Sequence, residues 1–119
     1  MNLKNKIAWC IPNCIPLPTC TTGEEVITFI RTTKSWAYQE DFIIRNSNYV
    51  VYFRQPSVSD NQQYTWSVTL CKGSYWIVMT ETYGDGWSSG SNVVLKVGST
   101  TIGTYTCSMS SPSSYTFTV

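Results

Sequence analysis

Histidine is absent from the 119-residue chain. Without it the protein has no Ser-His-Asp or Cys-His catalytic arrangement and no imidazole ligand for zinc. Seven carboxylates would be enough for a paired-carboxylate glycosidase, but such an enzyme usually needs a larger scaffold to form its cleft. We therefore expect no enzymatic activity.

Charge is also scarce. Charged residues make up 13% of the chain, about half the usual share, and the net charge is +1. The basic residues are scattered and form no stripe with interleaved aromatics, which argues against nucleic-acid binding. No apolar run is long enough to span a bilayer. No Asn-x-Ser/Thr acceptor occurs, which disfavours a glycosylated eukaryotic surface protein.

The residues that are abundant favour β-structure. Threonine, tyrosine, tryptophan and valine suit half-buried pleated surfaces, and aromatics reach 14%. Apolar runs recur at intervals of about 8–12 residues without an amphipathic helix, which is typical of a sandwich or barrel. The expected strands cover residues 26–30, 36–44, 49–53, 64–70, 75–80, 92–97, 100–107 and 115–119. We predict an all-β, jelly-roll-like antiparallel β-sandwich of about eight strands over residues 23–119, with an up-and-down barrel as the alternative.

Residues 1–22 have a different character. Pro12, Pro16 and Pro18 fix φ and remove backbone donors, so this segment should be an extended arm rather than a helix. Its apolar side chains must be covered by its own sandwich or by a neighbouring subunit. The basic start lacks the apolar core of a signal peptide, so either a signal was trimmed or none existed, as in a virion protein assembled inside a host cell.

Cysteine is the second strong signal, at Cys10, Cys14, Cys20, Cys71 and Cys107. No Cys-x-x-Cys pair exists, which excludes zinc-ribbon and thioredoxin motifs. The odd count suggests two bridges and one remaining thiol, and the alternative is five reduced cysteines in a cytosolic protein. We expect Cys71 to pair with Cys107, because both lie at the ends of strands that flank a central loop at residues 81–87. This pairing leaves the odd thiol in the arm.

That central loop runs from Glu81 to Trp87. Gly84 and Gly86 tolerate positive φ and let the backbone coil around Asp85, so that carbonyls turn inward beside two carboxylates. Calcium takes six to eight such oxygen ligands. The alternative is a hairpin loop in which the glycines and the aspartate only form a turn.

The run Glu-Thr-Tyr-Gly-Asp-Gly-Trp resembles the D-x-Y-G-D-G-W loop of β-sandwich modules in secreted, cell-surface and large-virus proteins. The resemblance extends over residues 24–119, although only the loop is specific. It implies a calcium-stabilised loop with Glu81 and Asp85 as metal ligands, and it implies no chemistry. Glu81 replaces the first aspartate, which shifts its oxygens. In the resembling modules a glutamate recurs just before the mid-domain aromatic, and Glu40 matches it. Glu40 is either a third acidic ligand or a carboxylate that points into water.

Two classes of function fit these observations. The first is a structural or assembly protein, such as a virion, filament or surface-layer subunit, that packs with copies of itself or with other structural proteins. The second is a calcium-dependent carbohydrate-binding or adhesion module that holds a glycan with Tyr83 and Trp87. Both place the protein at the cell surface, outside the cell or in a virion.

Overall fold

The computed structural model describes residues 20–108 and 112–119. Their strands are β1 (Glu24–Thr32), β2 (Glu40–Arg45), β3 (Val51–Arg54), β4 (Gln63–Cys71), β5 (Ser74–Glu81), β6 (Asn92–Val97), β7 (Thr100–Tyr105) and β8 (Ser113–Thr118). A single 3-10 turn, η1 (Ala37–Gln39), precedes β2. Within these residues no helix is long and apolar enough to cross a membrane.

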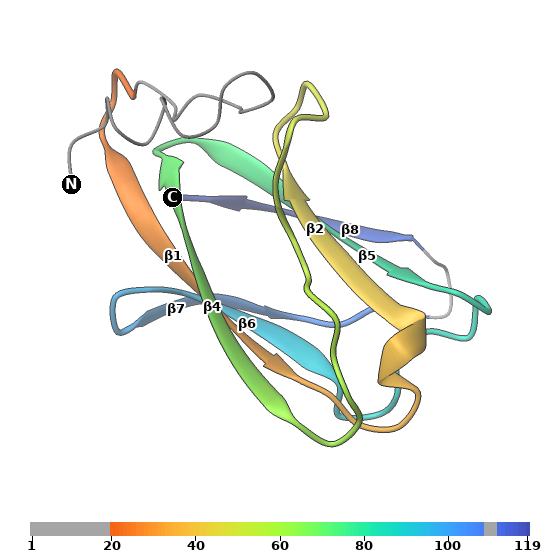
Figure 1. Cartoon of the computed structure of the whole chain (residues 1–119). Coiled ribbons are helices and arrows are strands. Elements are labelled where there is room, and N and C mark those ends of the chain that lie inside the picture. Colours follow the sequence, from red (N-terminus) through yellow and green to blue (C-terminus); the bar gives the residue numbers. More distant parts are fainter. Residues whose placement is uncertain (1–19, 109–111) are drawn as a thin grey trace, which may run out of the picture.

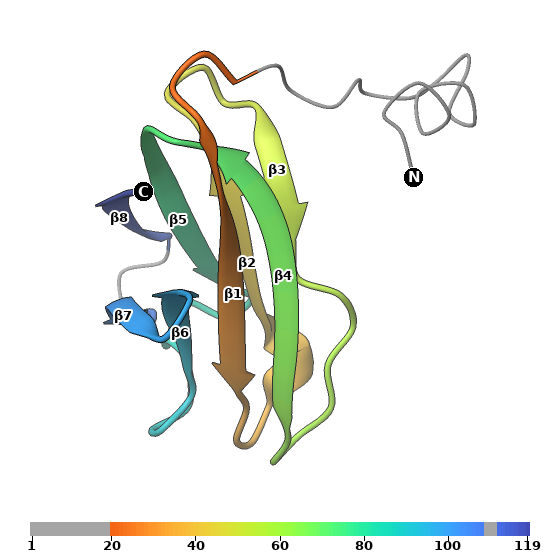
Figure 2. The same cartoon turned by 90° about the vertical axis from the view of Figure 1, so that its left-hand side faces the viewer.

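The strands form two four-stranded sheets that pack face to face (Figures 1 and 2). Sheet A has the order β4-β1-β6-β7 and sheet B the order β3-β2-β5-β8, and every neighbouring pair is antiparallel. The predicted antiparallel β-sandwich is therefore confirmed. The β1–β2 and β5–β6 connections both pass from one sheet to the other, so they can meet at one end of the sandwich.

Alternation along the strands builds the core. Side chains of β1 and β2 alternate between buried and more exposed positions, as expected where one face of each strand packs on the opposite sheet. Phe29 of sheet A and Phe42 of sheet B meet at 5.9 Å between ring centroids. Fully burying a side chain of this size stabilises the fold by about 1.5–3 kcal/mol. Other members of the core are Ile27, Ile44, Leu70, Ile77, Met79, Val93, Leu95 and Phe117.

The predicted Cys71–Cys107 bridge is wrong. Cys71 is bonded to Cys20, with 5.2 Å between their Cα atoms, and Cys107 is a buried free thiol. The thiol of Cys107 contacts the carbonyl of Met79, five residues along β5 from Ser74. At about 3.3 Å per residue this places Cys107 roughly 17 Å from the end of the strand where Cys71 lies, well beyond the reach of a disulfide. The two cysteines thus belong to opposite ends of the sandwich.

One predicted strand also starts too early. Residues 36–39 were expected to open a strand, but Trp36 adopts a left-handed conformation with φ of 64° and leads into η1, so β2 begins only at Glu40. Sheet pairing explains the boundary, because Glu40 is the first residue of β2 that has a partner on β5. The predictions for Cys10, Cys14 and most of the arm lie outside the described residues.

Candidate functional site

The loop between β5 and β6 starts with a tight coil around the glycines. Gly84 and Gly86 have φ of 76° and 81°, which only glycine adopts without strain. At Gly86 a side chain is also excluded by space, since an added Cβ would lie 2.9 Å from the carbonyl oxygen of Cys107. The amide of Trp87 donates to that same carbonyl at 3.0 Å. The loop is therefore fastened directly to the segment that follows β7.

Amide groups of the loop converge on Glu81. Its Oε1 accepts a hydrogen bond from the amide of Tyr83 at 3.0 Å, and its Oε2 accepts one from the amide of Asp85 at 2.9 Å. The coil thus turns N–H groups toward Glu81. This is the polarity that stabilises an anion, whereas the sequence predicted inward carbonyls.

The carboxyl groups of Glu81 and Asp85 lie close enough to share a proton. Burial acts to raise the pKa of Glu81, but hydrogen bonds from the Tyr83 amide, the Asp85 side chain and further loop amides outweigh it and hold that pKa below its ordinary value. The hydrogen bond to Glu81, burial and the charge of Glu81 raise the pKa of Asp85. The structure therefore brings together these two predicted metal ligands.

The third predicted ligand, Glu40, is occupied differently. It is 3% exposed, and its Oε1 accepts a 2.7 Å hydrogen bond from Arg31, a fully buried residue of β1 in sheet A. Its Oε2 accepts the amide of Ser88 at 2.7 Å. Glu40 thus ties sheet B to sheet A and to the loop, and its carboxylate does not point into open water.

Arg31 is the residue that sequence reasoning missed. The other two groups of its guanidinium donate to Gln55 Oε1 at 2.7 Å and to the carbonyl of Thr32 at 2.6 Å. Burial lowers the pKa of Arg31, and the hydrogen bond and charge of Glu40 only partly oppose that effect. A lone basic residue at the end of the apolar run 26–30 was the available signal for a buried ion pair.

Trp87 is mostly buried. It is 7% exposed, its ring lies 3.9 Å under the guanidinium of Arg31, and its indole N–H donates to the carbonyl of Thr80 at 2.9 Å. The role of Trp87 in holding a ligand stays a prediction that its burial disfavours, because most of this ring fills the end of the core and stacks on a buried cation. Tyr83, in contrast, is 70% exposed.

Calcium fits this arrangement only in part. Two adjacent carboxylates favour a cation, but both oxygens of Glu81 already accept amide hydrogen bonds, and Glu40 is paired with Arg31. Within residues 20–108 and 112–119, no three acidic, cysteine or histidine side chains gather as a metal-binding group. The calcium site remains a prediction in which Asp85 would supply the remaining carboxylate oxygens.

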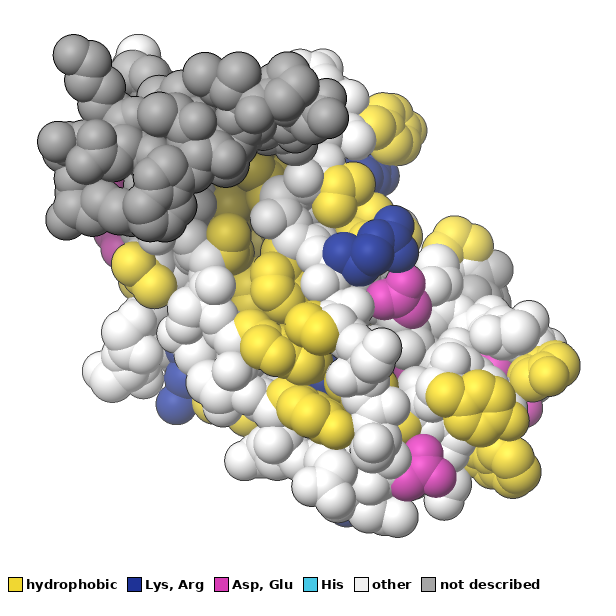
Figure 3. Space-filling model, in the orientation of Figure 1, with side chains coloured by type: hydrophobic (Ala, Val, Ile, Leu, Met, Phe, Trp, Pro, Cys, Tyr) yellow, Lys and Arg dark blue, Asp and Glu magenta, His cyan; other side chains and the backbone are white. Residues whose placement is uncertain are grey.

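Two further aromatics are exposed at this end of the sandwich. Trp36 and Tyr38 are 59% and 70% exposed, and their rings meet edge to face at 6.3 Å. Trp36 precedes η1 and Tyr38 lies within it, where Figure 3 shows hydrophobic side chains beside acidic ones at the lower right. Together with Tyr83 they form what we call the aromatic rim.

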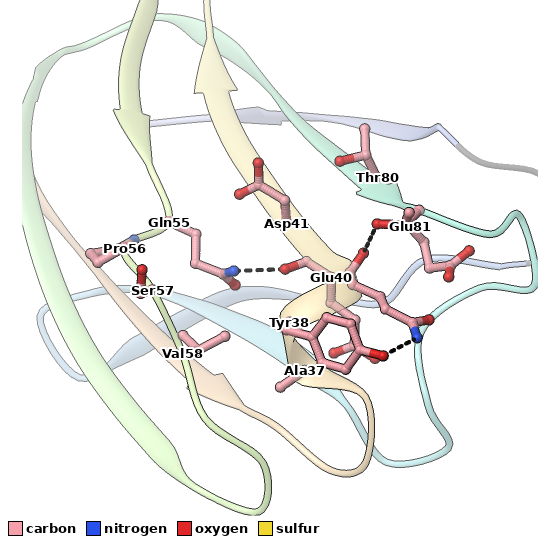
Figure 4. Close-up of a pocket in the computed structure, with 12 residues that line it drawn as sticks. Ala37, Tyr38, Glu40, Asp41, Gln55, Pro56, Ser57, Val58, Thr80 and Glu81 are labelled. Carbon is pink, nitrogen blue, oxygen red and sulfur yellow. Dashed lines mark hydrogen bonds between the residues drawn. The ribbon is translucent and has the colours of Figure 1, made fainter.

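Two depressions open beside the aromatic rim. The larger has a volume of about 580 Å³ and is lined by Tyr38, by polar side chains of β2 and β5, and by the segment after β3 (Figure 4). Gln55 reaches across it to the carbonyl of Glu40 at 2.8 Å. The smaller, of about 260 Å³, lies between Trp36 and Asp85. Both depressions therefore combine an exposed ring with amide, hydroxyl or carboxylate groups.

No protein-family model, no curated protein and no solved structure matched the chain. The geometry of the site is therefore the basis for assigning a function.

Proposed function

We propose that the protein is a non-enzymatic binding module that recognises carbohydrate with the aromatic rim. The observation that carries the proposal is the exposure of Trp36, Tyr38 and Tyr83 at one end of the sandwich, beside polar depressions. The C–H face of a sugar ring packs on an aromatic ring, while its hydroxyls hydrogen-bond to amide, carboxylate and hydroxyl groups. The rim offers both kinds of contact.

The backbone that carries the rim is held in place. The φ of 64° at Trp36 is unusual for a bulky side chain, and such conformations persist only where the surroundings impose them. Here the amide of Gln39 donates to the carbonyl of Trp36 at 3.0 Å, and the amide of Ala37 donates to Asp60 at 2.9 Å. A rigid rim loses little conformational entropy when a ligand binds, which favours recognition by exposed rings.

The test is a glycan array, followed by titration calorimetry with the best-bound sugar. Trp36→Ala and Tyr38→Ala should each weaken binding by about tenfold, equivalent to 1.4 kcal/mol. Tyr49→Ala is the matched control, since Tyr49 is 74% exposed but follows the opposite end of β2. Equal binding by all three variants, or no glycan bound by the unmodified protein, would refute the proposal.

Structural assembly is the second candidate, and the outer edge of β4 favours it. This nine-residue strand lies at the border of sheet A and contains no charged residue and no proline. Native proteins usually protect such an edge with charge, proline or a bulge, because it can pair with another chain. The Cys20–Cys71 disulfide is compatible with a secreted protein, and we propose a location outside the cell, at its surface or in a virion for either function.

A further inference from the structure

β4 is the longest of the four strands that border the two sheets. It has nine residues, against four in β3 and six each in β7 and β8, and its register against β1 is continuous from Gln63 to Cys71. In the part of the chain that the structure describes, no strand pairs with its outer edge (Figure 2). The strand contains no charge, proline or bulge, which are the features that usually keep such an edge from pairing. This edge can therefore accept another strand.

Two hydrogen bonds to β1 show which residues of β4 offer backbone groups to the outer edge. The amide of Lys72 donates to the carbonyl of Gly23, and the amide of Thr33 donates to the carbonyl of Gln62, both at 2.9 Å. Because N–H and C=O groups alternate between the two sides of a strand, the even positions of β4 direct theirs toward β1. The odd positions direct theirs to the outer edge: Gln63, Thr65, Ser67, Thr69 and Cys71.

The side chains of β4 alternate in the same way. The odd positions before Cys71 carry exposed polar side chains on the outer face of sheet A. The even positions point toward sheet B, yet Tyr64, Trp66 and Val68 are only half-buried. Trp66 contacts Phe53 of β3 at 5.8 Å between ring centroids, and Figure 3 shows hydrophobic side chains along this open side of the sandwich. Since directly opposite residues share a face of the sheet, an added strand must place polar residues opposite the odd positions and apolar residues opposite the even ones.

β4 itself has this pattern. We propose that two copies of the protein pair through their β4 strands, antiparallel about a two-fold axis at Ser67. With Ser67 opposite Ser67 of the second copy, Thr65 lies opposite Thr69 and Gln63 lies opposite Cys71. All of these are odd positions, so each pair exchanges its outward N–H and C=O groups in two hydrogen bonds. Every outward backbone group of the strand thereby finds a partner.

The inward face supports the same register. Trp66 lies opposite Val68 of the second copy, and Tyr64 lies opposite Leu70, at positions where the Cα atoms of an antiparallel pair approach to about 4.5 Å. An aromatic side chain opposite a β-branched one stabilises such a pair. The half-buried side chains of each β4 are thus covered by the β4 of the other copy, and the two sheets A join into one continuous sheet.

The distribution of charge favours a second copy as the occupant of this edge. In a two-fold pairing each residue meets a residue of the same strand, so charges of one sign on β4 would face each other, and β4 has none. The nearest charges along the chain, Asp60 before β4 and Lys72 after it, have opposite signs. Antiparallel pairing brings each of them to the end of the second copy that carries the other. This inference rests on the assembly function proposed above and is independent of carbohydrate binding.

The test uses the full chain and places charge at the two-fold axis. Ser67→Glu sets two carboxylates opposite each other, with their Cα atoms about 5.5 Å apart, and Ser67→Lys sets two ammonium groups there. The matched control is Thr28→Glu, because Thr28 lies beside Ser67 on the same face of sheet A, with 3.3 Å between the two hydroxyl oxygens. Thr28 is one strand further from the axis, so its two copies lie about 15 Å apart, beyond the Debye length of about 8 Å at physiological salt.

Sedimentation equilibrium measures the affinity of the dimer. We expect the unmodified protein and Thr28→Glu to form equally stable dimers, and the dissociation constants of Ser67→Glu and Ser67→Lys to be at least about fivefold higher. An equimolar mixture of the two Ser67 variants should restore the affinity, because each glutamate then faces a lysine. Hydrogen exchange should be slow at the even positions of β4 in every folded variant, whereas the odd positions should be protected only in dimers.

Three results would overturn the inference. Dimers of Ser67→Glu and Ser67→Lys as stable as those of Thr28→Glu would exclude β4 as the interface and leave the assembly function standing. A mixture of the two Ser67 variants that binds no more tightly than either alone would show that the Ser67 residues do not face each other. A monomeric unmodified protein would refute the second copy and the assembly function together, and protected odd positions in that monomer would assign the edge to another segment of its own chain. Glycan binding by Ser67→Glu reports on the proposed carbohydrate site separately.

Discussion

Replacing Glu40 by glutamine should destabilise the protein more than any exposed charge substitution. Glutamine has nearly the same shape and can still accept the amide of Ser88, so the change removes charge rather than volume. Arg31 would remain fully buried, between the two sheets, without its hydrogen-bonded counterion. The burial that lowers its pKa shows that its charge is poorly solvated.

The expected loss is about 3–5 kcal/mol in the free energy of unfolding, because that is the usual cost of removing one partner from a buried ion pair. For a domain of this size, this corresponds to a melting temperature lower by roughly 12–20 °C, at about 4 °C per kcal/mol. The neighbouring pair of Asp41 and Arg54 provides a matched control. Its atoms approach to 2.9 Å, but the side chains are 38% and 63% exposed, so Asp41→Asn should cost no more than about 1 kcal/mol.

Urea unfolding followed by tryptophan fluorescence measures both variants against the unmodified protein. A double variant, Arg31→Met with Glu40→Gln, should regain part of the lost stability, since no unpaired charge stays buried. The reasoning fails if Glu40→Gln unfolds within 1 kcal/mol of Asp41→Asn, a threshold set by the usual cost of an exposed pair. It also fails if the double variant is less stable than Glu40→Gln alone.

Three further predictions concern the disulfide and the loop. Cys71→Ser opens the bond between residues 51 positions apart and should cost about 4 kcal/mol in the loop-entropy model, measured by urea unfolding under non-reducing conditions; an unchanged midpoint would contradict it. The pKa of Asp85 is raised in the fold, so folding favours the protonated form of its carboxyl group. This contribution to stability is present at low pH and is lost as the pH rises through the folded pKa. In the presence of chelator, Asp85→Asn should therefore remove this loss and be at least as stable as the unmodified protein at pH 7. If the loop binds calcium, added calcium should raise the melting temperature of the unmodified protein more than that of Asp85→Asn, and equal shifts would reject the site.

The sequence by itself determined the fold class, because alternation of side chains is a local property of each strand. The regular change from inward to outward residues in β4 could be recognised without knowing its partner, and so could the glycines that coil the loop. The two carboxylates of that loop are four residues apart, and the structure does bring them together. Where neighbours in the chain are also neighbours in space, the sequence was a sufficient guide.

Only the tertiary structure decided which residues meet from distant segments. The choice of Cys20 as the partner of Cys71, and the distance of Cys107 from both, follow from which ends of β1, β4 and β5 coincide. The packing of the two sheets likewise buries Trp87 against Arg31 and leaves Trp36 in solvent, although both are tryptophans in polar loop segments. No local pattern encodes such contacts, because burial depends on the free energy of the whole packed interface and not on the residue alone.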